Sequence, residues 1–332
     1  MPSPTPDTPS EPSRHAATAL ASTAFIRRLP PSADEAAAGL NTLRDLIRWA
    51  CTRLNAAGAV FGHGTENAQD EATWLALWAL HLPLDRPEPF LDATLLPSER
   101  AAIARLIERR CDERVPAAYL TGEAWLRGMR FLADPRALVP RSLLVEMLEE
   151  GLDSWLPDTP VQTVLDLCTG SASIAIAAAL HFGHAHVDAC DLSDPALALA
   201  GDNRALYHLE DRLTLLQGDL YEPLGERRYD LILSNPPYVN AASMALLPAE
   251  FRQEPVGALA GGTDGMDLVE RILRGAPPHL NPEGLLVIEI GHEAAHFEAA
   301  FARLEFAYVP VSAGERMIVA ITREALSDWV GP

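Results

Sequence analysis

The sequence predicts an α/β fold, with a Rossmann-like, doubly wound and mostly parallel sheet that follows a small helical domain. Three observations carry this expectation. From Val161 onward, short apolar runs alternate with helical segments, a pattern typical of parallel sheets. Before residue 114, apolar residues recur at three- and four-residue spacing, which indicates helices. Two β-rich runs near the C-terminus, separated by Gly314, favour an antiparallel hairpin at the sheet edge.

The length of 332 residues and a hydrophobic content of 48% are enough for two domains, each with its own core. We expect a disordered tail over residues 1–22, because five prolines occur in its first twelve positions. A helical domain is expected over residues 23–114, a connector with a β-hairpin over 115–150, and the α/β domain over 151–332.

In the helical domain, two apolar stripes predict helices that share a core. Their residues are Leu40, Leu43, Ile47, Ala50 and Leu54 in the first, and Trp74, Leu75, Trp78 and Leu82 in the second. A third helix is expected to open at Pro97, with Ser98 as its cap. These aromatic residues are typical of a core rather than of a cofactor site. We expect this domain to recognise a partner.

In the α/β domain, apolar runs predict five strands in series, at residues 164–167, 187–190, 213–217, 229–233 and 285–290. Helices are expected over residues 143–152, 173–182, 194–209 and 266–280. Strands over residues 306–311 and 317–322 would form the final hairpin, and the alternation around 127–132 predicts the hairpin of the connector.

The net charge of −20 and the pI near 4.8 argue against stable nucleic-acid binding, because an acidic chain repels phosphate backbones. Such a chain attracts a basic protein, although acidity that serves solubility alone is an equal alternative. No apolar run is long enough to cross a membrane. Four widely spaced cysteines, Cys51, Cys111, Cys168 and Cys190, show no metal or redox spacing. They predict free thiols, no metal site and a cytoplasmic protein.

Polar signals follow four successive strands of the α/β domain, where open sheets of this type bind ligands. Gly170 lets backbone amides approach a ligand in the first loop. Asp191 can accept from two ribose hydroxyls, and Asp219 or the amide of Leu220 can address an adenine edge. Taken alone, each acid is more often a cap or turn residue, but the four signals occur in the order that a nucleoside site requires. Asp188 lies inside a strand and receives no role.

The fourth loop, Asn235-Pro236-Pro237-Tyr238, is rigid because each proline fixes its own φ and restricts the residue before it. The prolines have no N–H, so the loop offers acceptors and almost no donors. Such a surface suits a planar –NH2 group that is held by its own hydrogens. An ordinary turn at the end of a strand is the alternative if this loop is considered alone.

These motifs resemble the class I S-adenosyl-L-methionine-dependent methyltransferases. Downstream, Glu254-Pro255, Gly261-Gly262 and Asp264-Gly265 resemble the protein-glutamine N5-methyltransferases more narrowly, as does Tyr119-Leu120-Thr121-Gly122. The nearest branch methylates a glutamine of large-subunit ribosomal protein L-three, because Pro140-Arg141 is followed by Ser142 rather than by the run typical of release-factor enzymes.

The resemblance implies that S-adenosyl-L-methionine is the cofactor and that L-three is the protein substrate. The implied cofactor residues are Asp166, Cys168, Thr169, Gly170, Asp191, Asp219, Leu220 and Asn235. The implied catalytic residues are Asn235, Pro236 and Tyr238. Asn235 and the Pro236 carbonyl would accept from the two amide N–H bonds, and Tyr238 would form a wall of the pocket.

One position departs from the family pattern. The family usually has glycine where this chain has Ala172, whose methyl group fits if the backbone φ is negative, as in the first turn of a helix. In that case the methyl group would lie beside the amino-acid end of the cofactor.

There are four alternatives to this function. A nucleic-acid amino-methyltransferase uses a similar loop, but this chain has no Lys/Arg-rich target domain. A release-factor glutamine methyltransferase shares the chemistry. A non-catalytic nucleoside-binding protein is compatible with Ala172. A nicotinamide dehydrogenase is disfavoured by the missing glycines and by the Asn235 loop.

Overall fold

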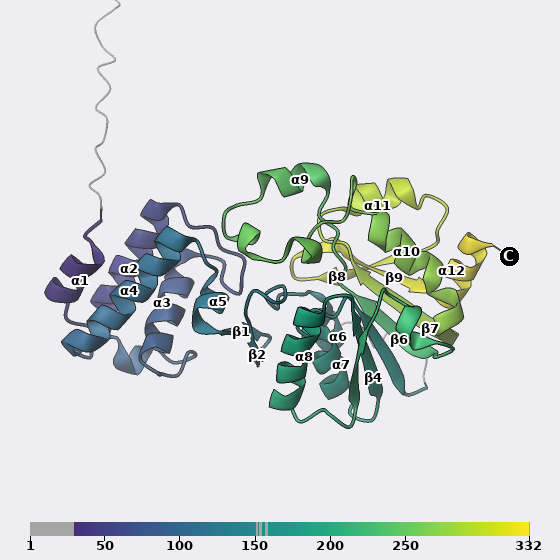
Figure 1. The fold of residues 1–332 in the computed structure, drawn as a ribbon, viewed down its shortest axis with the longest axis horizontal. Helices are drawn as coiled ribbons and strands as arrows, with labels where there is room; N and C mark the ends of the chain where they lie inside the picture. The colour runs from purple at the N-terminus through teal and green to yellow at the C-terminus, as the bar shows by residue number, and fades with distance from the viewer. Residues whose placement is uncertain (1–29, 151, 153–154, 157–158, 332) are drawn as a thin grey trace, which may run out of the picture.

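The computed structural model describes residues 30–150, 152, 155–156 and 159–331. The expected tail over residues 1–22 and the first part of the expected helical domain therefore lie outside the described residues. Figure 1 shows a group of helices on one side and a sheet with its covering helices on the other, joined by a short hairpin.

Five helices build the N-terminal part: α1 (Ala33–Gly39), α2 (Leu43–Ala57), α3 (Ala68–Ala79), α4 (Pro97–Glu113) and α5 (Ala117–Thr121). Their shared core contains Leu43, Ile47 and Leu75, as the two stripes predicted. The cap of α4 differs from the expectation. The Glu99 carboxylate accepts from the Leu96 N–H at 2.7 Å, so Leu96 is the N-cap and Ser98 is the second helical residue.

The connector contains β1 (Glu123–Leu126) and β2 (Met129–Leu132), which pair antiparallel. The expected hairpin is therefore confirmed. Helix α6 (Leu144–Glu150) follows it and lies within the range that the sequence predicted.

The main sheet has seven strands: β3 (Thr163–Leu167), β4 (His186–Asp191), β5 (Leu213–Gln217), β6 (Tyr229–Ser234), β7 (Leu280–Glu289), β8 (Ala307–Val311) and β9 (Gly314–Thr322). They lie in the order β5-β4-β3-β6-β7-β9-β8. The first five in this order are parallel, and β8 and β9 add the predicted antiparallel hairpin at one edge. The chain order reverses between β3 and β6, which is where such sheets bind ligands.

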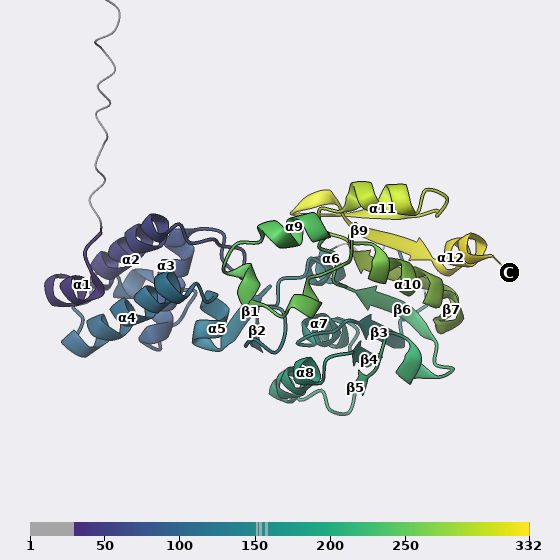
Figure 2. The ribbon, with the colours of Figure 1, turned by 45° about the horizontal axis from the view of Figure 1, so that its top comes forward.

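Six further helices follow α6: α7 (Ser173–His181), α8 (Asp194–Leu206), α9 (Ala241–Leu246), α10 (Asp267–Gly275), α11 (Ala294–Ala300) and α12 (Arg323–Val330). One face of the sheet packs against α6, α7 and α8, and the other packs against α10, α11 and α12. Figure 2 shows these layers. Both faces are thus apolar, which explains why the parallel strands are continuous apolar runs.

Helix α10 is shorter and β7 longer than predicted. The helix ends at Gly275, and β7 begins at Leu280 instead of residue 285. Pro277 and Pro278 explain the early stop, because proline has no N–H to continue the helical ladder. The sequence pattern also gave no prediction of α9, α11 or α12, which are short.

All four cysteines are free thiols, as expected, and Cys111 and Cys190 are buried. In the part of the chain that the structure describes, no helix has the length and apolar character needed to span a membrane.

Candidate functional site

A cavity of about 510 Å³ lies at the carboxyl ends of β3, β4, β5 and β6. Each of the four loops after these strands contributes to its lining. From the sequence-predicted site residues, the lining contains Cys168, Thr169, Gly170, Asp191, Asp219, Leu220 and Asn235. Three predicted site residues do not line it, namely Asp166, Pro236 and Tyr238.

The loop after β3 has an alternating left-handed backbone. Cys168, Gly170 and Ala172 have φ values of 60°, 57° and 63°. Such alternation turns successive N–H groups toward one side, the arrangement found in anion-binding nests. Gly170 adopts this conformation without strain, whereas Cys168 and Ala172 each carry a steric cost.

Asp166 lies beneath this loop rather than in the cavity wall, and its side chain is fully buried. Its Oδ2 accepts from the Thr169 hydroxyl at 2.5 Å and from the Ala175 N–H at 3.1 Å. Its Oδ1 has no hydrogen-bond partner among the described residues. Burial raises the pKa of Asp166 to about 7, although the two hydrogen bonds oppose the rise.

Asp191 ends β4 and reaches the cavity. Its two oxygens accept from the Gly170 N–H and the Ser193 N–H, both at 2.8 Å. Burial raises the pKa of this carboxyl above its usual range. Asp191 therefore joins the first loop to the second, and each of its oxygens keeps a lone pair for a further donor.

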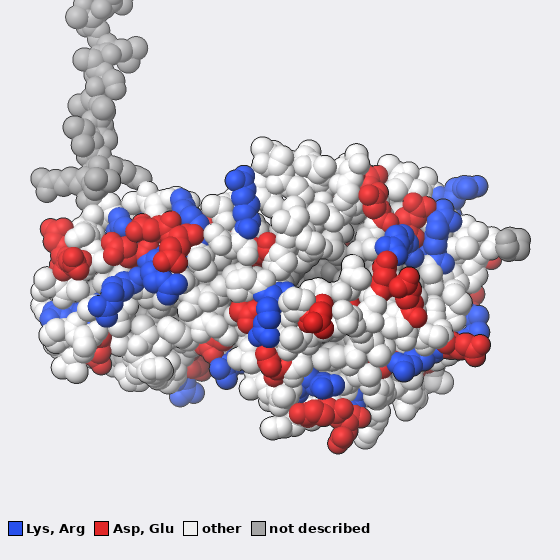
Figure 3. All heavy atoms as spheres, viewed as in Figure 1, with Lys and Arg blue, Asp and Glu red and all other residues white. Residues whose placement is uncertain are grey.

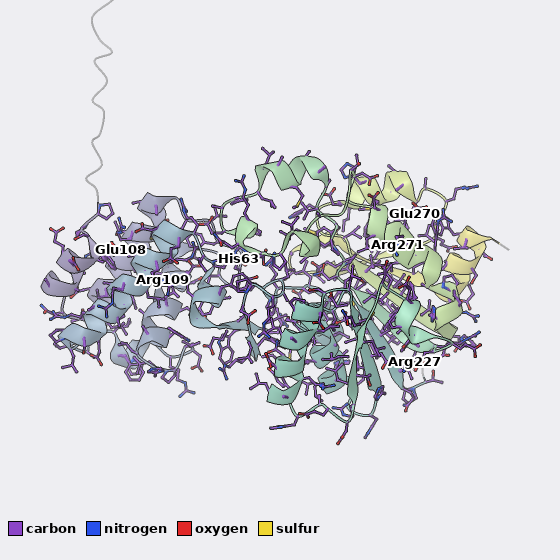
Figure 4. The ribbon with its side chains drawn as sticks, viewed as in Figure 1. His63, Glu108, Arg109, Arg227, Glu270 and Arg271 are labelled. Atoms are coloured by element: carbon purple, nitrogen blue, oxygen red, sulfur yellow. The ribbon has the colours of Figure 1, made fainter. Side chains whose placement is uncertain are left out.

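Asp219 follows β5 and forms an ion pair of 2.8 Å with Arg271. Arg271 comes from α10, is labelled in Figure 4 and also lines the cavity. The sequence analysis did not identify Arg271. A helix was expected over residues 266–280, but the place of Arg271 at the cavity depends on how that helix lies on the sheet.

At the end of β6, the buried Ser234 hydroxyl donates to the Leu167 carbonyl at 2.9 Å, which ties the strand to β3. Asn235 and Pro237 line the cavity. Among the described residues, neither the Asn235 side chain nor the Pro236 carbonyl takes part in a hydrogen bond. Asn235 thus offers an unengaged acceptor at the cavity, and the unengaged Pro236 carbonyl lies next to it in a loop fixed by two prolines.

Tyr238 differs from the expectation that it forms a wall of the pocket. Its hydroxyl donates to the buried Glu289 at 3.1 Å, and its ring lies against Gly291, where an added Cβ would be 2.6 Å away. Glu289 also accepts from Ser142 at 2.6 Å. A buried carboxylate requires such donors. Because the Tyr238 hydroxyl serves as one of them, its side chain anchors the Asn235 loop and does not line the cavity.

Gly261 and Gly265 allow the downstream chain to pack closely against the backbone of Tyr238 in the Asn235 loop. A Cβ on Gly261 would be 2.7 Å from the Tyr238 Cα, and one on Gly265 would be 2.1 Å from the Tyr238 carbonyl oxygen. Gly265 also has a φ of +85°. Only glycine allows such close approach, so the motif requires glycine at both positions.

Two segments complete the cavity, residues 136–142 and 255–258. Glu254 joins them, because it accepts from Arg141 at 2.5 and 2.8 Å and from the Val139 N–H at 3.1 Å. Burial raises the pKa of Glu254, but the hydrogen bonds and charges of Arg141 and His63 outweigh it and lower the pKa to about 2. The sequence analysis singled out Glu254-Pro255 and Pro140-Arg141-Ser142 as motifs but did not pair them.

Ala172 corrects a further expectation. Its φ is +63° rather than negative, its methyl group is fully buried in the core beside α7, and it does not line the cavity. The backbone must be left-handed here to begin α7 directly after the loop. The methyl group therefore points into the core instead of toward a cofactor.

We expect Ala172→Gly to leave cofactor affinity unchanged, because the methyl group does not face the cavity. Relief of the left-handed strain, about 1–2 kcal/mol, is opposed by the loss of a buried methyl, about 0.8 kcal/mol, and by the freedom of glycine, about 0.5–1 kcal/mol. Calorimetric titration with S-adenosylhomocysteine and thermal unfolding check this. A severalfold gain in affinity would show that the methyl group crowds the ligand.

The comparisons with known proteins agree with this architecture. The family described as "Methyltransferase small domain" matches residues 142–252. A ribosomal protein uL3 glutamine methyltransferase of Bordetella pertussis is 57% identical over 289 residues, which cover 87% of this chain and 97% of that protein. Its namesake from Burkholderia pseudomallei is 54% identical over 298 residues, covering 87% and 97%. A third, from Neisseria meningitidis serogroup B, is 48% identical over 294 residues, covering 88% and 97%.

These matches confirm the predicted fold class and the enzyme class. The shared region includes the cavity, its four strand-end loops and most of the helical domain, since it spans nearly nine tenths of the chain. The chain belongs to the family of ribosomal protein uL3 glutamine methyltransferases.

Proposed function

We propose that this protein transfers a methyl group from S-adenosyl-L-methionine to the side-chain amide nitrogen of a glutamine in ribosomal protein uL3. The observation that carries the proposal is the pair of unengaged acceptors at Asn235 and Pro236, at the end of β6 beside the cavity. The names of the related proteins support the choice of substrate.

The residues around the cavity fit this cofactor. Asp166 does not line the cavity, but it keeps one buried oxygen without a partner beneath the first loop, and a charge there would attract the positively charged amino group of the cofactor. Asp191 offers acceptors for the ribose hydroxyls, and Asp219 with Leu220 suits the adenine edge. When bound, the cofactor supplies a methyl group on a positively charged sulfur. Cys168, Thr169 and Gly170 complete the proposed cofactor residues.

The protein's own contribution is mainly positioning. An amide nitrogen is a poor nucleophile because its lone pair is delocalised into the carbonyl group. Asn235 Oδ1 and the Pro236 carbonyl would each accept one N–H of the substrate amide and hold the nitrogen in place. Such orientation is worth up to about 7–11 kcal/mol. The same acceptors stabilise positive charge that develops on nitrogen. Tyr238 would act through Glu289 by holding the loop.

Cofactor affinity is expected to depend on the protonation of Asp166. Because the pKa of this buried carboxyl is about 7, it is mostly neutral at pH 6 and mostly charged at pH 8. Only the charged form attracts a cationic amino group, so the affinity should rise about tenfold between these pH values. The nearby Asp191 carboxylate contributes to the raised pKa. Calorimetric titration at both pH values measures the change.

The matched control is Asp166→Asn, which is nearly the same size and does not titrate. The titration of the ligand itself affects both proteins equally. The contribution of Asp166 is therefore the difference between the two proteins in how much their affinity changes from pH 6 to pH 8. An equal pH dependence in both would mean that Asp166 stays neutral or does not meet the amino group.

We further propose that the helical domain, residues 23–114, is the place where the protein substrate docks. The chain carries a net charge of −20, which speeds the encounter with a basic ribosomal protein that is not yet covered by RNA. The face in Figure 3 carries acidic and basic groups side by side over both domains, without a continuous basic patch. The binding of uL3 should weaken as salt is raised.

A direct test incubates the protein with isotopically labelled S-adenosyl-L-methionine, purified ribosomal proteins and purified ribosomal RNA. The proposal expects label on uL3, and an initial rate of labelling about 10²–10³-fold lower when Asn235→Ala replaces the native protein. Label on RNA and none on protein would contradict the proposal and favour a nucleic-acid methyltransferase.

A further inference from the structure

We propose that Glu250 is a positioning residue, through which the helical domain sets the loop that closes the cavity and supports the Asn235 loop. This inference rests on the proposed function where it concerns the rate of methyl transfer. The part that concerns the position of the loop stands on the contacts alone.

The loop between α9 and α10 lies between the two domains. It carries Glu250, Phe251 and Glu254 within five residues, followed by the cavity-lining segment 255–258. The Phe251 ring packs against the ring of His63 in the helical domain, with the centroids 4.3 Å apart and the ring planes tilted by 48°. Figure 4 places His63 at the junction of the two domains. The loop is therefore held by the helical domain before it reaches the cavity.

Glu250 makes the strongest of these contacts, and its side chain is about 1% exposed. One oxygen, Oε1, accepts from Val60 N–H at 3.0 Å, from Arg110 at 3.1 Å and from Arg114 at 2.9 Å. All three donors belong to the helical domain or its last residue. Burial raises the pKa of Glu250, but the hydrogen bonds from Val60 and Arg110 outweigh it, and the net pKa is lowered. The carboxylate is thus charged at neutral pH.

Arg110 is itself fully buried and needs its partners. It donates to Glu71 at 2.8 Å, to Glu250 and to the Val60 carbonyl at 2.8 Å. Breaking a buried ion pair leaves an uncompensated charge, which is costly. Glu250 therefore has one well-defined position, because only there do Arg110 and Val60 both find their partner.

From Glu250 the constraint passes to the cavity through Glu254, four residues later. Glu254 binds Arg141 and Val139 of the opposite wall. Its Oε2 also lies 3.5 Å from the buried His63 Nε2. The segment from Pro255 to Ala258 thus follows directly on two anchors, Glu250 on the helical domain and Glu254 on the wall formed by residues 136–142.

The same loop then supports the Asn235 loop directly. The Val239 N–H donates to the Leu259 carbonyl at 2.9 Å, and the Gly261 N–H donates to the Val239 carbonyl at 2.9 Å. A shift of the loop would move Val239, which lies four residues after Asn235. Orientation is the proposed source of catalysis, and small displacements of a reacting group are costly.

The test compares Glu250→Gln with Glu71→Gln in the full chain. Both changes remove one carboxylate from the same buried Arg110, and both side chains are about 1% exposed. Glu71 differs in that its partners, Arg110 and Thr65, all lie in the helical domain. A purely structural role would give both variants the same effect. A positioning role would affect the cavity loop only in Glu250→Gln.

The first measurement is hydrogen exchange of the backbone amides of Val239 and Gly261. We expect exchange to be at least tenfold faster in Glu250→Gln and unchanged in Glu71→Gln, when both are compared at equal folded fraction. Equal acceleration in both variants, or none in either, would overturn the proposal. If Glu250→Gln does not fold, Glu250→Asp replaces it, because aspartate keeps the charge. Exchange at Val239 and Gly261 should then still be faster in Glu250→Asp than in Glu71→Gln, by a smaller factor.

The second measurement is the rate of methyl transfer to uL3. We expect kcat to fall at least tenfold in Glu250→Gln, less than threefold in Glu71→Gln, and partly to recover in Glu250→Asp. The affinity for S-adenosylhomocysteine should stay within threefold. If the native protein methylates no uL3, the proposed function fails, and the hydrogen-exchange result alone decides the positioning role.

Discussion

Asn235→Ala is expected to lower the rate of methyl transfer by two to three orders of magnitude while cofactor affinity changes little. Asn235 lines the cavity from the end of β6, and its side chain has no hydrogen-bond partner among the described residues. Its loss therefore removes a contact to the substrate and hardly disturbs the fold. Loss of one well-placed polar contact to a reacting group typically costs about 10²–10³ in rate.

The measurement separates the two effects by single-turnover kinetics at saturating cofactor and by calorimetric titration with S-adenosylhomocysteine. A drop in rate with affinity within threefold supports the role of Asn235. An equal loss of rate and affinity, together with lower thermal stability, would mean that Asn235 is a structural turn residue.

Asp191→Ala is expected to weaken cofactor binding more than tenfold. The change removes the acceptors for the ribose and also the carboxylate that holds the Gly170 N–H at 2.8 Å. Hydrogen bonds to charged groups are worth about 1.5–3 kcal/mol each, and 1.4 kcal/mol corresponds to a factor of ten in affinity. At saturating cofactor, the transfer rate should fall much less.

Asp188 on the same strand supplies the control. It is also buried, but its partners are Tyr229 at 2.7 Å and Arg227 at 3.0 Å, and it does not line the cavity. Asp188→Ala should therefore lower stability without a specific loss of affinity. If both substitutions weaken binding equally after correction for the folded fraction, Asp191 has no direct role at the cofactor.

The arrangement of the sheet was predictable because its signals are local. Each parallel strand is a continuous apolar run that ends at a polar loop, and a parallel sheet brings the carboxyl ends of its strands to one edge. This is why Asp191, Asp219 and Asn235, which are far apart in sequence, meet at one cavity.

Long-range pairing was not predictable from one sequence. Glu250 meets Arg110 across 140 positions, and Glu254 meets Arg141 across 113. Nothing in the local pattern around an acidic residue tells which buried arginine it will face. The left-handed backbone of Ala172 was not predicted for a related reason. The core around α7 imposes this conformation, although alanine itself disfavours it.

The buried contacts also change how the helical domain can be tested. Deleting residues up to Arg114 would remove Arg110 and leave Glu250 buried without its partners. Loss of activity would then report a damaged cavity as well as a lost docking surface. Substitution of exposed residues, such as Asp112 on α4, changes the proposed docking surface and leaves the buried network intact.

The most direct test of the central proposal is mass spectrometry of two purified substrates after incubation with the protein and S-adenosyl-L-methionine. The two substrates are uL3 and a release factor that carries the glutamine recognised by the sister branch. The proposal predicts a mass gain of one methylene group on a glutamine of uL3 and none on the release factor. The same gain on the release factor, with none on uL3, would contradict it.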